Sequence, residues 1–594
     1  MFILTLFSGT AFAWNATDEV RRLNREAPGL DGYKGAQAVI WLNDNVFRML
    51  PDGTMENTRY TIVMMGENIP DMEKKFKLPV PSDGKLEILE AAWYNPMTGL
   101  KEGKLSITDE PLPGGAVGKV FETPDSAVGR AVVLVVKETR GKRYGIDATI
   151  PMASPLPAWE QNVIVELPEG TQLNWVGHEM KDPVVTKANG VQSYKWTVMN
   201  QEPWNGEGFV VYKRPYLTFS TKKGLAMSLK EMNDLSRELP DIPLPPEAKG
   251  DRLKAGVRLM EWLAQPSRHL ASYPKGWVRP AAQFPADGPW TRWEQTLLLN
   301  KWLNKLGWTS EIWWQSKEKL DKDTPSARSA WVGPVLALTP PNGKESLYHA
   351  GQTSDFGITA PSVLGTTLYG LKNDEPVTKD IKPGSPSDHK LASVWVLKLK
   401  DNGVAEGTFT LNVTGGWTEL FSAGHVPSKE RLAKFVQSKI NFAIPGMILT
   451  PSEVVSLPTG YRLQFSVQCA PGLILKDNLL LRLPGGVPAR VGEMIGKNSD
   501  YTLRFPFVID QKVRMDMPKG YRIVQEPIMK NLGTGTKATL KESIYHWPKK
   551  SELTADSTWT VKMTDVRKEL AAVLKEELNA CLRWPVLDIP FRKK

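Results

Sequence analysis

The segment from Gly288 to Trp314 has the pattern of a helix that could present a nucleophile at its N-terminus. Pro289 and Thr291 are residue types that open helices, and apolar side chains then recur at helical spacing until Gly307, a typical helix stop. The residues 309–314 that follow have the pattern of a strand. In this order of elements, the helix dipole and free amides would lower the pKa of a thiol in the first turn.

No cysteine lies near this segment. The chain has two, Cys469 and Cys581, which could form a disulfide in an oxidising compartment or could be two separate buried thiols. Neither has a neighbouring histidine or basic cluster, so a reactive thiol is not expected. The six histidines lack metal-ligand spacing and no glycine-rich nucleotide turn is present, so we expect neither a metal nor a cofactor.

The composition is that of a globular protein with sizeable cores. Of 594 residues, 41% are hydrophobic and 24% are charged, which allows several domains. A net charge of +10 would favour acidic cell-surface polymers or lipid headgroups at long range. Because no basic run is concentrated in one segment, a mildly basic protein without such a role is the simpler interpretation, and nucleic acid is not an expected partner.

The first residues resemble a secretion signal. Residues 1–13 hold a short apolar run that ends in Ala11-Phe12-Ala13, which predicts cleavage after Ala13 and a periplasmic or extracellular protein. No later run is long and apolar enough to predict a transmembrane segment in the mature chain.

The remaining chain divides into three predicted parts, and the predicted fold class is multidomain α+β. Short strands separated by turns predict an N-terminal β-sandwich over 14–238. A proline-rich linker over 239–246 precedes a helical and extended α+β core over 247–380. After a second linker, a β-rich region over 389–594 contains one long helix at about 566–582.

Four stretches, taken in order, resemble a family of secreted bacterial proteins that combine an N-terminal β-sandwich domain of unknown function with a transglutaminase/protease-like core and C-terminal β-domains. The stretches are AVIWLNDNVFRMLPDGTMENTRYTIVMM, PDSAVGRAVVLVVKET, RPYLTFSTKKG and FVIDQKVRMDMPKGYRIV. The resemblance covers most of the mature chain. It implies that the core over 247–380 has a transglutaminase- or papain-like fold.

Catalytically competent members of that family carry a cysteine, a histidine and an aspartate. In this sequence the cysteine position aligns with Arg292, the histidine position with Trp331 and the aspartate position with His349. The resemblance therefore implies a core without its catalytic triad. Thr291 is the nearest hydroxyl and could act only with a base such as His349, whereas a plain N-cap role is the simpler interpretation.

A cation at Arg292 in the first turn is opposed by the helix dipole. Pairing with Glu294, solvation, or a bound anion would each make it tolerable.

Seven tryptophans fall between Trp290 and Trp331 in the predicted core, an unusual concentration. Trp302 at mid-helix is expected to be buried, whereas Trp290, Trp293, Trp313 and Trp314 are candidates for a stacking surface that binds a glycan or an apolar peptide. The alternative is that these indoles fill the volume of a closed active site.

These features predict a non-catalytic secreted protein of the cell envelope that binds or scaffolds an envelope protein or glycan. Two alternatives remain open. One is a cysteine-independent acyl-transfer or peptidase enzyme that uses Thr291, or an enzyme that uses Cys469. The other is a glycan-binding module that uses exposed tryptophans.

Overall fold

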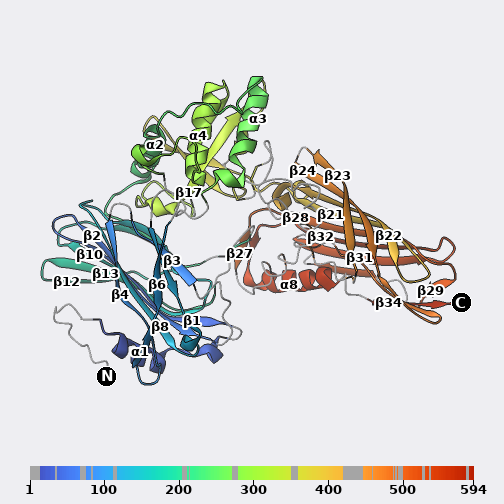
Figure 1. Cartoon of the computed structure of the whole chain (residues 1–594), viewed down its shortest axis with the longest axis horizontal. Coiled ribbons are helices and arrows are strands. Elements are labelled where there is room, and N and C mark those ends of the chain that lie inside the picture. The colour runs from blue at the N-terminus through green and yellow to red at the C-terminus, as the bar shows by residue number, and fades with distance from the viewer. Residues whose placement is uncertain are drawn as a thin grey trace.

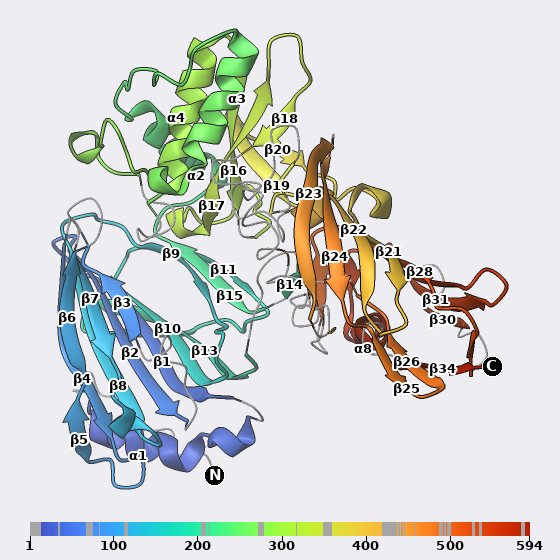
Figure 2. The same ribbon diagram turned by 45° about the vertical axis from the view of Figure 1, so that its right-hand side comes forward.

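The computed structural model has three groups of elements, which Figures 1 and 2 show at the lower left, top and right. It is multidomain and rich in β-structure, with few helices, as the sequence predicts. It describes residues 14–594 except 34–35, 67–74, 82–83, 112–116, 204–209, 213, 271–277, 317, 349–358, 361, 419–435, 437–439, 441–443, 445, 458, 486, 488–490, 492–494, 496–499, 525–528, 534–536 and 584–587. The predicted signal peptide and His349 therefore lie outside the described residues.

The N-terminal group is built on an eight-stranded sheet whose order is β12-β13-β10-β1-β2-β8-β4-β5. Its strands are β1 (Ala38–Met49), β2 (Met55–Met65), β4 (Gly84–Tyr94), β5 (Lys101–Lys104), β8 (Ala131–Arg140), β10 (Ala158–Pro168), β12 (Val184–Ala188) and β13 (Val191–Gln201). Two three-stranded sheets accompany it, β3 (Lys75–Pro79), β7 (Val117–Glu122) and β6 (Ser106–Pro111), and β11 (Asn174–His178), β15 (Tyr216–Ser220) and β9 (Asp147–Pro151).

Strand β8 shows how this sheet is covered on both faces. Val133 and Val135 pack under helix α1 (Ala16–Glu26), whereas Val132 and Leu134 pack with Phe121 of the small sheet on the other side. Because successive side chains of a strand point to opposite faces, a strand buried on both sides is a continuous apolar run. That is the pattern found in the sequence over 130–137.

The middle group, at the top of Figure 1, packs three helices against a five-stranded antiparallel sheet. The helices are α2 (Leu225–Arg237), α3 (Arg252–Leu263) and α4 (Arg292–Lys305), and the sheet order is β18-β17-β16-β19-β20. Its strands are β16 (Thr309–Ser316), β17 (Trp331–Thr339), β18 (Ser346–Tyr348), β19 (Thr367–Lys372) and β20 (Glu375–Asp380). Both α4 and β16 form where the sequence predicts a helix and a strand.

Residues 225–237 were expected to belong to the sandwich over 14–238, but they form helix α2, which packs with the middle sheet. Its Leu229 and Met232 are buried in one cluster with Trp331 and Tyr369. The change from sandwich to α+β core therefore falls near Gly224, because the apolar face of α2 is complementary to the middle sheet.

The proline-rich stretch over 239–246 is not a free linker. Leu239 and Ile242 are buried, and their carbonyl groups accept hydrogen bonds from Lys301 Nζ at 2.7 Å and Trp302 Nε1 at 3.0 Å. An extended proline-rich segment has no internal hydrogen bonds, so side chains of α4 supply the donors instead.

The C-terminal group has one large hydrophobic core. An eight-stranded sheet contributes to it from one side, and helix α8 (Lys568–Arg583) and a four-stranded sheet contribute the rest. The large sheet has the order β23-β24-β22-β21-β28-β32-β31-β30. Its strands are β23 (Ile448–Leu457), β24 (Gly460–Cys469), β22 (Ala405–Thr414), β21 (Lys390–Leu399), β28 (Phe507–Asp516), β32 (Glu552–Val561), β31 (Ala538–Trp547) and β30 (Met529–Gly533). The small sheet joins β25 (Gly472–Leu475), β26 (Asn478–Arg482), β34 (Asp588–Lys593) and β29 (Tyr521–Ile523).

One short sheet connects the N-terminal group to the C-terminal group. Strand β14 (Val210–Tyr212) pairs antiparallel with β27 (Tyr501–Leu503), which also pairs with β33 (Asp565–Val566). A hydrogen bond of 2.6 Å from the backbone of Thr149 to Ser329 Oγ connects the sandwich to the residues just before β17.

None of the described helices is both long and apolar enough to cross a membrane.

His389 fixes the segment that leads from the middle group into the C-terminal group. It is buried, its Nε2 lies 2.6 Å from the carbonyl oxygen of Pro383, and its Nδ1 accepts a hydrogen bond of 2.9 Å from the amide of Gly416. This arrangement requires a neutral ring with the proton on Nε2, and burial lowers the pKa of His389 below its ordinary value of 6.5.

We expect His389 to make the protein less stable in acid. Because the folded state disfavours the charged ring, its contribution is fully present above pH 6.5 and is lost as the pH falls below that value. Urea unfolding at pH 7 and pH 5 should show a smaller pH effect in His389→Gln than in the wild type. Replacement of the surface residue His178 by Gln is the control, and equal pH dependence in wild type and His389→Gln would contradict the assignment.

Candidate functional site

The N-terminus of α4 is a completed capping box. Thr291 Oγ1 accepts a hydrogen bond from the backbone amide of Glu294 at 3.2 Å, and Glu294 Oε2 accepts one from the backbone amide of Thr291 at 2.9 Å. Thr291 is buried, and these hydrogen bonds make its hydroxyl the N-cap of α4, which is the simpler interpretation of the sequence. This reciprocal pair of hydrogen bonds stabilises the first turn. It also engages the Thr291 hydroxyl, which is the hydroxyl nearest to the expected nucleophile position at Arg292.

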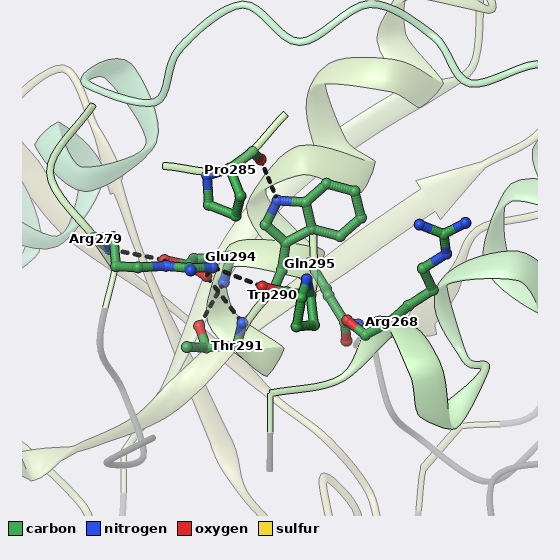
Figure 3. Close-up of polar contacts among 8 residues, drawn as sticks. Arg268, Arg279, Pro285, Trp290, Thr291, Glu294 and Gln295 are labelled. Atoms are coloured by element: carbon green, nitrogen blue, oxygen red, sulfur yellow. Dashed lines mark hydrogen bonds and ion pairs between the residues drawn. The ribbon is translucent and has the colours of Figure 1, made fainter. Parts of the chain in front are cut away.

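Glu294 also forms a buried ion pair with Arg279, which Figure 3 shows beside the cap. Glu294 Oε1 accepts hydrogen bonds from Arg279 N at 2.8 Å and Nε at 2.9 Å, and Glu294 Oε2 accepts one from Nη2 at 2.7 Å. Arg279 Nη2 additionally donates to the carbonyl oxygen of Pro289 at 2.8 Å. Both side chains are at most 3% exposed, so each charge is neutralised by its partner and by these hydrogen bonds rather than by water.

Arg292 does not pair with Glu294, contrary to one of the sequence-based expectations. Its side chain is exposed, and the Glu294 carboxylate is turned inward to Arg279. Water around the exposed guanidinium screens its repulsion from the helix dipole.

The residues aligned with the first two triad positions come from adjacent parts of the structure. Trp293, next to Arg292, donates from Nε1 to the carbonyl oxygen of Val332 at 3.0 Å, and Val332 follows Trp331. The Trp331 ring is buried and donates from its Nε1 to Ser228 Oγ at 2.9 Å. The N-terminus of α4 and the start of β17 thus meet. The position expected for a general base holds the buried indole of Trp331.

His269 was not singled out from the sequence, and it lies beside this helix end. It forms a parallel bridge with Trp290, the residue before the N-cap, and burial together with the charge of Arg292 lowers its pKa. The irregular chain between α3 and α4 brings it there, and no periodic pattern in the sequence signals that path. A neutral imidazole here could accept a proton, but the buried Thr291 hydroxyl is already a hydrogen-bond acceptor in the cap.

Three of the four proposed stacking tryptophans are buried, which corrects that expectation. Trp290 and Trp293 are at most 5% exposed, and Trp314 is fully buried. They form edge and tilted contacts with other indoles, such as Trp290 with Trp302 at 6.1 Å between centroids. Their π-faces are therefore part of the core, as expected for Trp302.

Trp313 is partly exposed, but its ring already has neighbours. Lys379 Nζ lies 5.6 Å from the ring centroid, and a side chain at Gly370 would come within 3.2 Å of the ring. The Nε1 group points to Glu311 Oε2 at 3.3 Å.

The two cysteines are free and buried, so they do not form the disulfide that was one alternative. Burial raises the pKa of Cys469 to about 12 and that of Cys581 likewise to about 12. Both are thiols at neutral pH, and a thiolate nucleophile is disfavoured. Among the described residues, no group of three His, Cys, Asp or Glu side chains has the arrangement of a metal site.

Comparisons with known proteins identify a shared fold. No family model matches the sequence, and no curated relative matches it. A crystal structure from Parabacteroides distasonis, provisionally described as a protease, matches with a TM-score of 0.56 and 12% identity over 94% of this chain and 99% of that chain. An M1 zinc metallopeptidase from Deinococcus radiodurans has a TM-score of 0.20 and 10% identity over 40% of this chain and 55% of that chain. The first likeness shows that the arrangement of nearly the whole chain is a fold found in another protein.

The buried pair predicts a large cost for removing one partner. Arg279→Met should lower the free energy of unfolding by about 3–5 kcal/mol, because the Glu294 carboxylate would stay buried without its cation. Urea unfolding measures the effect. The exposed pair of Arg237 and Asp234 provides the control, since Arg237→Met should cost less than about 1 kcal/mol.

A second substitution separates loss of charge balance from loss of packing. Adding Glu294→Gln to Arg279→Met removes the uncompensated charge and keeps an acceptor for the cap, so the double variant should be more stable than Arg279→Met alone. A double variant that is less stable by the sum of both effects would contradict this account.

Proposed function

We propose that this protein is a non-catalytic secreted protein of the cell envelope, which binds or scaffolds other envelope components. In this proposal the middle group is a transglutaminase-like core that has lost its triad. The observation that carries it is the state of Thr291, the hydroxyl nearest to the expected nucleophile position at Arg292, which is buried and engaged in the capping box. An acyl-transfer nucleophile needs an accessible hydroxyl and a base within hydrogen-bond reach.

Further contacts around α4 support the loss of the triad. The buried Trp331 indole occupies the position expected for the histidine and is fixed by Ser228. The Arg279–Glu294 pair supports the same helix end from inside, so the first turn is stabilised without any ligand. The arrangement of a helix on an antiparallel sheet is compatible with the resemblance of the sequence to transglutaminase-like proteins.

The enzymatic alternative has weaker support. Cys469 is a buried thiol with a raised pKa, and Thr291 is committed to the cap. The Parabacteroides protein provisionally described as a protease shares the fold at 12% identity, and fold alone does not carry activity to another sequence.

A scaffold role is supported by the connections between the groups. Strand β14 extends a sheet that contains β27, and the Thr149 amide bonds to Ser329 beside β17. Backbone hydrogen bonds between groups restrict their relative motion, which suits a protein that presents fixed surfaces to partners.

An activity assay on the mature chain tests the proposal. We expect no hydrolysis of peptides and no transfer to amine acceptors by the wild type. Thr291→Asn is the informative variant, because an asparagine keeps an N-cap acceptor while it removes the hydroxyl. Activity in the wild type that is lost in Thr291→Asn and retained in Thr291→Ser would overturn the proposal and identify Thr291 as a nucleophile.

A further inference from the structure

The small sheet of the C-terminal group has one buried and one exposed face. Leu479, Leu481, Ile589 and Phe591 point into the C-terminal core. Because side chains alternate along a strand, the intervening residues of β25, β26, β34 and β29 face solvent. In Figures 1 and 2 this sheet lies at the end of the C-terminal group away from the middle group.

One row across the exposed face is aliphatic. Leu473 is paired with Leu480, which is paired with Pro590 on the next strand. The amide of Val524 donates to the carbonyl oxygen of Pro590 at 2.9 Å and so continues the row. The exposed fractions of Leu473, Leu480 and Val524 are 55%, 37% and 56%, which makes a contiguous apolar strip in water.

The neighbouring row is basic. Arg592 is paired with Arg522 across β34 and β29, and both side chains are exposed. Like charges directly opposite each other in a sheet are destabilising. Among the described residues of this sheet, Arg482 forms an ion pair with Asp588, whereas Arg522 and Arg592 have no acidic partner within ion-pair distance.

We propose that this leucine–arginine face (Leu473, Leu480, Pro590, Val524, Arg522 and Arg592) binds the surface of an anionic phospholipid membrane. The charge of the paired arginines is complementary to lipid phosphates, and the adjoining aliphatic row is complementary to the acyl chains just below them. An anionic membrane offers both chemistries side by side, and it relieves the repulsion between the arginines. The proposal concerns the C-terminal group and does not depend on the state of α4.

Vesicle sedimentation of the mature chain tests this proposal. We expect the protein to sediment with vesicles of phosphatidylcholine mixed with phosphatidylglycerol but not with phosphatidylcholine alone, and to be released by salt. Removing each arginine should weaken binding about fivefold, as measured with Arg522→Gln, Arg592→Gln and the double variant. Leu473→Ser combined with Leu480→Ser should weaken it at least severalfold, because the apolar contribution is lost.

Matched controls lie elsewhere on the surface. Leu89→Ser replaces a leucine that is 56% exposed on the sandwich, and Arg237→Gln replaces an exposed arginine on α2, so neither should change vesicle binding. Urea unfolding of the Arg522→Gln and Arg592→Gln variants should show no loss of stability, since they relieve a like-charge contact. Reduced binding is then not a result of unfolding.

Three outcomes would overturn the proposal. The first is no sedimentation with the mixed vesicles, and the second is unchanged sedimentation of both the arginine and the leucine variants. The third is a leucine variant that binds mixed vesicles like the wild type while soluble polyphosphate displaces the protein. That third result would assign the face to soluble polyanions.

Discussion

The carboxylate of Glu294 receives four hydrogen bonds, three from Arg279 and one from the amide of Thr291, and it fixes how the chain enters α4. The same arginine holds the carbonyl oxygen of Pro289, so the irregular chain before the helix is shaped around one buried charge pair. Trp290 then lies against Trp262 of α3 and Trp302 of α4. A buried ion pair of this kind specifies one geometry, because any other position would leave a charge without a partner.

This arrangement also engages groups at the N-terminus of α4 that a ligand or a nucleophile would otherwise use. A helix N-terminus can lower the pKa of a nucleophile or hold an anion only while its amides are free. Here the Thr291 hydroxyl accepts from the amide of Glu294, the Glu294 carboxylate accepts from the amide of Thr291, and the indole of Trp331 is buried. The first turn of α4 is therefore stabilised by side chains of the chain itself.

Local signals in the sequence predicted the local structure well. Thr291 as an N-cap, Gly307 as a helix stop and the burial of Trp302 are confirmed, because each depends on neighbours within a few residues. The partner of Glu294 could not be predicted. Arg279 lies in an irregular segment where no periodicity indicates direction.

The predictions for residues 225–246 and for the exposure of the tryptophans differ from the structure for a common physical reason. The sequence indicates that 239–246 is extended, but it does not show which surface covers that segment or residues 225–237. Tertiary contacts decide that, and here the carbonyl groups of Leu239 and Ile242 are satisfied by α4. Likewise, aromatic side chains that could stack on a ligand can equally stack on one another, and only the structure distinguishes the two.

The pairing of β14 with β27 has a consequence for the order in which the chain acquires its structure. Residues 210–212 are synthesised well before residues 501–503, so their backbone hydrogen-bonding groups must wait for most of the chain to emerge. The sheet of β14, β27 and β33 therefore cannot form until residues 501–503 have been synthesised, and it closes a very long loop. A nascent chain that has released only the sandwich and the α+β core still carries an unpaired strand edge, which is the kind of surface that chaperones protect.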